Sequence, residues 1–161
     1  TVDDYYFLVP VSTFDGFTSG SGDLFVSNTL SVEEENITKV EIHDLAAKKK
    51  FSASRSLNSD ADVVWTAFDG KELDKNKIQE IIRGFKDLNV LLVSADDVPA
   101  PNDLAVKITQ GEALKTYTFS QSGKLEDGRD CHFLRVEGDP NHYCYLQNNV
   151  TNFKNTIPFT E

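Results

Sequence analysis

Cysteine and histidine residues gather near the C-terminal end of the sequence. Cys131 stands next to His132, and His142 stands two residues before Cys144. Thiolates and imidazoles are the usual protein ligands of zinc. Three outcomes are therefore open for the two cysteines: a metal site, a disulfide bond or two free thiols. The alignment of the strands that carry them decides between these outcomes.

The segment Gly138–Asn141 between the two pairs is rich in turn-forming residues and predicts a hairpin. With this segment as the loop, Cys131 faces Asn148 and Cys144 faces Arg135. The cysteines are then offset by four residues along the ladder, which is roughly 13 Å at the rise of a strand. A disulfide needs Cα atoms within about 7 Å of each other. We therefore expect two free, partly buried thiols.

The three histidines, His43, His132 and His142, are the only imidazoles that could act as a general base. The sequence contains no Gly-x-Ser-x-Gly motif, and neither cysteine has the sequence surroundings of a thiol protease. Alternation along a strand also places His132 on the opposite face from Cys131. We therefore expect histidines at the surface or its rim, with no catalytic residue, no metal site and no cofactor.

Aromatic residues on the predicted strands form a second candidate group. They are Trp65, Tyr117, Phe119, Phe133, Tyr143 and Tyr145. Exposed, such rings form a platform for sugars; buried, they fill a core. Because alternation gives each strand a buried face, core packing is the favoured interpretation. If the chain has a ligand platform, we expect it at a cleft near Trp65, His132 or His142.

The overall composition restricts the partners. The 161 residues carry 16 Lys and Arg against 26 Asp and Glu, for a net charge of −10. Such an acidic chain repels nucleic acid and anionic lipid surfaces. No apolar run approaches the ~18 residues that a membrane-spanning helix needs. We therefore expect neither nucleic-acid binding nor insertion of this segment into a membrane.

The clearest helical pattern begins at Asp74, which suits the N-cap position. The apolar residues that follow it at spacings of three and four are Ile78, Ile81, Ile82, Phe85 and Leu88. This spacing places them on one face of a helix. The pattern predicts one long helix over Asp74–Leu88, followed by a buried strand over Val90–Val93.

Segments rich in β-branched and alternating residues predict strands on both sides of this helix. They are Ile37–His43, Phe51–Ser56, Asp62–Phe68, Asp103–Ile108, Leu114–Phe119, Cys131–Glu137 and His142–Gln147. A short helix is expected to begin near Thr151. The sum is an α+β domain: mostly antiparallel sheet, hairpins in the C-terminal half and one long helix packed on one face.

The two ends of the sequence share a weak pattern, an aromatic strand followed by a polar cap and an apolar periodic segment. A displacement of 136 positions brings Phe7 onto Tyr143 and Phe17 onto Phe153. This similarity is typical of repeated units. One interpretation is that residues 1–36 are the tail of a preceding unit, packed with the rest, and that residues 37–161 form one full unit.

The junction between these units also carries a family resemblance. Its segments are Val11–Phe17, Asp23–Phe25 and Ser31–Ile42. With the strand that carries Trp65 and the capped helix Asp74–Leu88, they resemble the bacterial family of domains of unknown function numbered 4340. One element departs from the family's pattern: members carry Tyr-Gly-Leu-x-x-Pro after the strand that follows the helix, whereas Val98–Pro101 stands here.

The resemblance implies an extracytoplasmic module of a membrane-anchored bacterial envelope protein, with its anchor outside this sequence. Members occur in tandem, and no enzymatic activity is established for them. We therefore expect a non-catalytic monomer that binds a protein or envelope component, or that acts as a spacer. The alternative is an enzyme-like or ligand-binding domain with a pocket over the sheet for a glycan or peptide. A pocket with convergent polar groups and a perturbed titratable residue would favour this alternative.

Overall fold

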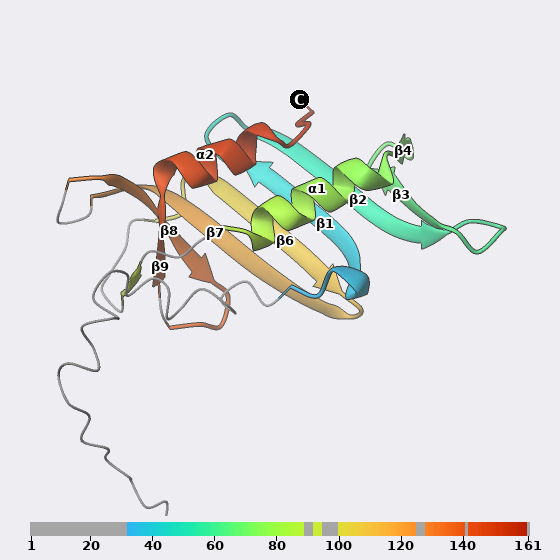
Figure 1. Cartoon of the computed structure of the whole chain (residues 1–161), viewed down its shortest axis with the longest axis horizontal. Coiled ribbons are helices and arrows are strands. Elements are labelled where there is room, and N and C mark those ends of the chain that lie inside the picture. The colour runs from blue at the N-terminus through green and yellow to red at the C-terminus, as the bar shows by residue number, and fades with distance from the viewer. Residues whose placement is uncertain (1–31, 89–91, 95–99, 125–127, 141, 161) are drawn as a thin grey trace, which may run out of the picture.

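The computed structural model describes residues 32–88, 92–94, 100–124, 128–140 and 142–160. Within these residues, nine strands form one antiparallel sheet in the order β4-β3-β2-β1-β6-β7-β8-β9-β5 (Figure 1). The strands are β1 (Ile37–Asp44), β2 (Lys49–Leu57), β3 (Val63–Ala67), β4 (Glu72–Leu73), β5 (Leu92–Ser94), β6 (Leu104–Gln110), β7 (Ala113–Lys124), β8 (Asp130–Val136) and β9 (His142–Leu146). Two α-helices lie on one face of this sheet. The α+β class is therefore confirmed.

The expectation of one long helix is wrong. Helix α1 covers Lys75–Lys86 only, and a second helix, α2, covers Gln147–Asn155. The N-cap prediction is confirmed, because the Asp74 carboxylate accepts a hydrogen bond from the backbone N–H of Asn76 at 2.8 Å. Helix α2 begins before Thr151 because the strand ahead of it ends at Leu146.

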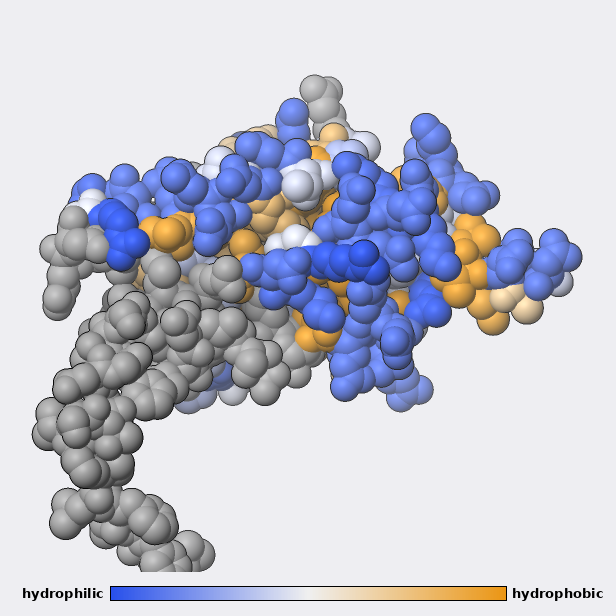
Figure 2. All heavy atoms as spheres, in the orientation of Figure 1, coloured by the Kyte–Doolittle hydropathy of each residue, from blue (hydrophilic) through white to orange (hydrophobic). Residues whose placement is uncertain are grey.

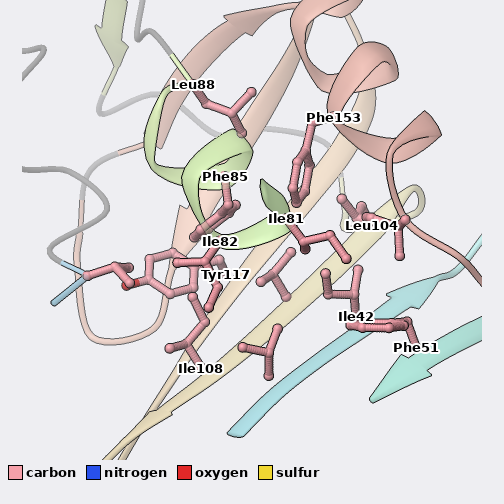
Figure 3. Close-up of a cluster of buried hydrophobic side chains, with 14 of the residues drawn as sticks. Ile42, Phe51, Ile81, Ile82, Phe85, Leu88, Leu104, Ile108, Tyr117 and Phe153 are labelled. Atoms are coloured by element: carbon pink, nitrogen blue, oxygen red, sulfur yellow. The ribbon is translucent and has the colours of Figure 1, made fainter. Parts of the chain in front are cut away.

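The apolar stripe of α1 packs onto the sheet together with α2. Ile78, Ile81, Ile82 and Phe85 are each at most 2 % exposed. Figure 3 shows Phe85 among the rings that join the layers; its centroid lies 5.1 Å from that of Tyr117 and 5.6 Å from that of Phe153. Each fully buried side chain of this size contributes about 1.5–3 kcal/mol through the hydrophobic effect. The layer between helices and sheet is thus a filled apolar core.

The segments before and after α1 belong to opposite edges of the sheet. The chain enters α1 from β4, at one edge, and continues to β5, at the other. In a simple β–α–β unit, the strands before and after the helix are close together in the sheet. Here they lie at its two opposite edges. The expected strand Val90–Val93 overlaps β5 in part, and its residues 90 and 91 lie outside the described residues.

The sheet face away from the helices is polar over its central strands. Alternation places Ser52, Ser54 and Thr118 on this face, and all three are half-buried. Lys39 and Glu41 share it, with the Lys39 ammonium 3.1 Å from the Glu41 carboxylate. Figure 2 views the opposite, helix-bearing face, which is also largely hydrophilic. The described part of the chain therefore holds its apolar side chains mainly between the two layers.

Two further expectations concern larger segments. Of residues 1–36, assigned above to a preceding unit, residues 1–31 lie outside the described residues. Among the residues that are described, neither helix is long and apolar enough to cross a bilayer.

Candidate functional site

The three platform candidates do not meet at one site. Trp65 lies on β3, and His132 lies on β8, with four strands between them in the sheet order. His142 lies on β9 opposite Arg135, whereas His132 lies opposite Tyr145. Strand alternation therefore places His142 and His132 on opposite faces of the sheet. A single platform built from Trp65 and both histidines is excluded.

His132 instead belongs to a buried charged cluster beneath α2, with Asp103 at its centre. Its Nε2 lies 3.0 Å from Oδ2 of Asp103, and both side chains are only 2 % exposed. Lys154 of α2 donates to Oδ1 of the same carboxylate at 2.7 Å. Its ammonium also lies 3.1 Å from the Asp44 carboxylate at the end of β1. The expectation of surface histidines is therefore wrong for His132, because a buried carboxylate stabilises its ring inside the protein.

The backbone holds this cluster from two sides. The N–H of Leu45 donates to the carbonyl oxygen of Asp103 at 2.8 Å, which ties the turn after β1 to the start of β6. The second oxygen of Asp44 accepts from the N–H of Ala47 at 2.8 Å. These bonds fix the backbone at Asp103 and the carboxylate of Asp44, and Lys154 links α2 to both segments.

Hydrogen bonds decide the charge states in this cluster. Burial alone would raise the pKa of Asp103, but hydrogen bonds from His132 and Lys154 outweigh it and hold that pKa below its usual value. Burial likewise opposes the charge on Lys154, and its bonds to Asp103 and Asp44 outweigh it and raise the pKa of Lys154. Asp103 and Lys154 are therefore a charged pair at neutral pH.

Two polar atoms next to the cluster lack a hydrogen-bond partner among the described residues. They are Nδ1 of His132 and the hydroxyl of Tyr145, the residue directly across from His132 on β9. Burial raises the pKa of Tyr145, so this hydroxyl stays protonated. In a catalytic triad, a hydrogen-bonded His–Asp pair accepts the proton of a nucleophile that contacts the second ring nitrogen of the histidine. Here the second ring nitrogen of His132 contacts no nucleophile among the described residues.

A cleft of about 350 Å³ opens between α1 and strands β2 and β3, with Trp65 in its wall. The Trp65 side chain is only 4 % exposed, so its ring belongs mainly to the core, as the alternation predicts. Three cationic side chains, from Arg55, Lys75 and Arg83, line the opening. Arg83 lies 3.7 Å from the Glu34 carboxylate. We call this the Trp65 cleft; its volume suits a small ligand.

A more open cleft of about 750 Å³ adjoins it, because Glu35 and Arg55 line both. This second cleft lies where β2 continues to Leu57, past its last pairing with β1. Arg55 separates the two spaces by donating a hydrogen bond to the backbone oxygen of Glu35. A third, shallow groove of about 320 Å³ runs between α1 and α2. None of these three spaces is lined by Asp103, His132 or Lys154.

The cysteines are free and buried, as expected, but the predicted register is wrong by two residues. Cys131 lies opposite Leu146, and Cys144 lies opposite Phe133. The loop between the strands starts earlier on β8 than the turn residues indicate, because pairing ends at Arg135 and His142. The cysteines are therefore offset by two residues on one face, not by four. Among the described residues, no three His, Cys, Asp or Glu side chains group as metal ligands would.

Sequence reasoning missed Asp44, Asp103 and Lys154. Two of them carried a signal. Asp44 continues the buried alternation of Val40 and Ile42, and Lys154 follows Val150 by four residues on the inner face of α2. A charged residue in an apolar register indicates a buried partner. Asp103 comes just before β6 and carried no such signal.

Comparisons of the chain with protein-family models, with curated proteins and with solved structures find no match. The resemblance to family 4340 therefore stays a prediction. Arguments about function rest on the geometry of the two charged regions, the buried cluster and the Trp65 cleft.

Proposed function

We propose that this chain is a non-catalytic binding or spacer module of a membrane-anchored bacterial envelope protein, related to family 4340. The observation that carries the proposal is a separation in space. The carboxylate with a shifted pKa, Asp103, is enclosed in the core, whereas the open clefts lie elsewhere. An enzyme brings a perturbed group and a pocket together.

The buried cluster supports a structural role. Lys154 bonds to carboxylates from two different segments, Asp44 and Asp103, and so fixes α2 against the sheet. Breaking such a buried pair is costly, so α2 and the strands resist separation. A rigid layer of this kind suits a domain that holds its neighbours at a set distance or presents a fixed surface.

The location is tested on the full-length gene product, expressed in a bacterial host. Intact spheroplasts are treated with an added protease, and an antibody against this chain follows its digestion. We expect digestion before lysis, while a cytoplasmic control protein survives. Protection of the chain until the cells are lysed would contradict the extracytoplasmic assignment.

The absence of catalysis is tested separately with the purified chain. Ester, peptide and glycoside probes are incubated with the wild type and with the His132→Gln variant. We expect both to match the buffer rate for every probe. Turnover in the wild type that the His132→Gln variant loses would show an active His–Asp pair and overturn the non-catalytic assignment.

A second candidate function is the binding of a small anionic glycan or peptide in the Trp65 cleft. The specific observation in its favour is charge: in a chain of net charge −10, three cations and two glutamates line one cleft of ligand size, so cations are in excess there. Among them, Arg55 and Arg83 each contact the Glu34–Asn36 turn, whereas Lys75 makes no ion pair within the described residues. An acidic ligand would find Lys75 available.

Trp65 provides the readout, since it is the only tryptophan of the chain. Uronic-acid oligosaccharides and acidic peptides are titrated while its fluorescence is recorded. Binding in the cleft predicts a saturable change that weakens several-fold in Lys75→Ala. The matched control is Lys86→Ala, at the far end of the same helix. Equal titrations for both variants would contradict binding at the cleft.

A further inference from the structure

Cys131 and Cys144 lie on neighbouring strands and on the same face of the sheet. Cys131 pairs with Leu146, and Phe133 pairs with Cys144, so the cysteines are diagonal neighbours across the β8–β9 ladder. Both side chains are at most 2 % exposed. In a regular ladder, diagonal Cα atoms are about 7–8 Å apart, with Cβ atoms closer. The cysteines are therefore near the upper limit of disulfide reach.

The two thiols are near enough for each to affect the other. Burial, and after it the neighbouring Cys131 thiol, raise the pKa of the Cys144 thiol. On the other side of β8, Gly123 of β7 leaves room for the Cys131 sulfur: a Cβ at position 123 would lie 2.7 Å from that Sγ and 2.2 Å from the Phe133 ring. Only glycine fits there without displacing Cys131. Glycine at position 123 therefore lets the Cys131 side chain keep its place on the face that it shares with Cys144.

We propose that Cys131 and Cys144 are a disulfide-forming pair, and that the free thiols of the structure are its reduced state. The bond requires the Cα atoms to approach by about 1 Å from a regular diagonal spacing. The neighbouring strands allow this adjustment. Within the described residues, strand β9 has only the three-residue β5 on its outer side, and the register of β7 already shifts between Gln121 and Gly123.

The oxidant is a disulfide, either glutathione disulfide or a protein disulfide donor. One cysteine thiolate attacks a sulfur of this oxidant, forming a mixed disulfide and releasing one thiol. The second cysteine then attacks the cysteine sulfur of the mixed disulfide and releases the other half as a second thiol. The protein loses two protons and two electrons, and the oxidant takes them up and is reduced to two thiols.

Folding determines when this exchange occurs. Burial raises the pKa of the Cys144 thiol, so the folded protein holds it as a poor nucleophile. The bond therefore forms while the chain is unfolded or locally open, and the fold then encloses it. The inference rests on the proposed extracytoplasmic location in one respect only, since that compartment supplies the oxidant.

The experiment refolds the purified full chain from denaturant with glutathione disulfide and reduced glutathione present. Remaining thiols are then alkylated under denaturing conditions and counted by mass spectrometry. We expect a monomer with no reactive thiol, two hydrogens lighter than the reduced chain, and unfolding at a higher urea concentration. The single variants Cys131→Ser and Cys144→Ser should each retain one thiol or carry one glutathione.

Two results would overturn the inference: a refolded wild type with both thiols still reactive, or one that carries glutathione adducts or intermolecular dimers instead. The mass of the wild type decides the matter even if a serine variant fails to fold. A second measurement incubates the folded chain with glutathione disulfide. Thiol loss should be much slower than during refolding and should accelerate in urea. The refolding experiment tests the disulfide, and the spheroplast experiment tests the location. A negative result in one therefore does not decide the other.

Discussion

The buried cluster and the Trp65 cleft both combine cationic and carboxylate side chains, but in opposite surroundings. In the cluster, Asp103 and His132 are 2 % exposed, and distances of 2.7–3.0 Å join the Asp103 carboxylate to Lys154 and His132. At the cleft, Arg83 is 64 % exposed and lies 3.7 Å from the Glu34 carboxylate. Both regions join a cation to a carboxylate, but water screens only the second pair.

This difference separates charges that hold the fold from charges that are available to a ligand. A buried pair that loses one partner leaves an uncompensated charge in the core, which costs several kcal/mol. An exposed pair contributes about 0–1 kcal/mol, because water replaces the lost partner. The cluster is therefore expected to control stability, and the cleft to control binding. Four predictions test this division, from the largest effect to the smallest.

Replacing the central carboxylate gives the largest effect. Asp103→Asn keeps the shape but removes the charge that both His132 and Lys154 bond to. We expect the free energy of unfolding to fall by about 3–5 kcal/mol in urea titrations. The control is Arg83→Gln at the cleft, for which we expect less than about 1 kcal/mol. Equal losses of unfolding free energy in the two variants would contradict the idea that the cluster, and not the cleft, controls stability.

Lowering the pH should reduce the free energy of unfolding in the same way, because it protonates Asp103. Because the pKa of Asp103 is lower in the folded than in the unfolded protein, the unfolded state binds the proton first as the pH falls. The stability that this carboxylate contributes is therefore complete above 3.8, the ordinary pKa of an aspartate, and is lost as the pH falls through the lower pKa of the folded state.

The measurement compares unfolding free energies of the wild type and Asp103→Asn from pH 7 downwards. The other carboxylates titrate in both proteins, so only the difference between the curves reports on Asp103. We expect this difference to be constant near neutral pH and to shrink below about pH 4. A difference that grows in acid would mean that Asp103 is protonated in the folded protein at neutral pH.

Short-range sequence patterns predicted the face of helix α1 that is buried and the residue at which the helix begins. The spacing from Ile78 to Phe85 identified the buried face of α1, and Asp74 identified its start. The predicted β8–β9 register was wrong because turn-forming residues indicate that a loop is present but do not fix where pairing ends on each strand. Since side chains alternate with a period of two, an error of two residues kept Cys131 on its predicted face and changed only its neighbours.

Short-range patterns could not predict the charged cluster, because its members come from segments that are far apart in the sequence. Asp103 meets His132 and Lys154 only after β6, β8 and α2 have packed together. Asp103 follows a proline-containing segment, where an aspartate is usual in a solvated turn. The sequence therefore allowed a prediction of the two layers, but not of the charges that join α2 to the sheet.

Removing the imidazole gives a smaller effect than removing the carboxylate. His132→Leu fills a similar volume, and Lys154 still compensates the charge of Asp103. The loss is one hydrogen bond to a charged acceptor, about 1.5–3 kcal/mol. Thermal and urea unfolding should both show it. A cost equal to that of Asp103→Asn would indicate that His132, not Lys154, is the main partner of the carboxylate.

The smallest expected effect has the opposite sign. The Tyr145 hydroxyl is buried beside His132 and has no hydrogen-bond partner among the described residues. Tyr145→Phe removes this unpaired group and keeps the ring against Phe119, at a centroid distance of 5.8 Å. We expect unchanged stability or a gain of about 1 kcal/mol, since an unsatisfied buried group is costly.

The matched control is Tyr143→Phe, two residues earlier on β9. The Tyr143 hydroxyl donates a hydrogen bond to Asp139 in the β8–β9 loop, so its removal should cost about 1 kcal/mol. Urea titrations of both variants give the comparison. If Tyr145→Phe destabilises the chain as Tyr143→Phe does, its hydroxyl has a partner in solution. The buried cluster would then extend to β9 through a bound water or a segment outside the described residues.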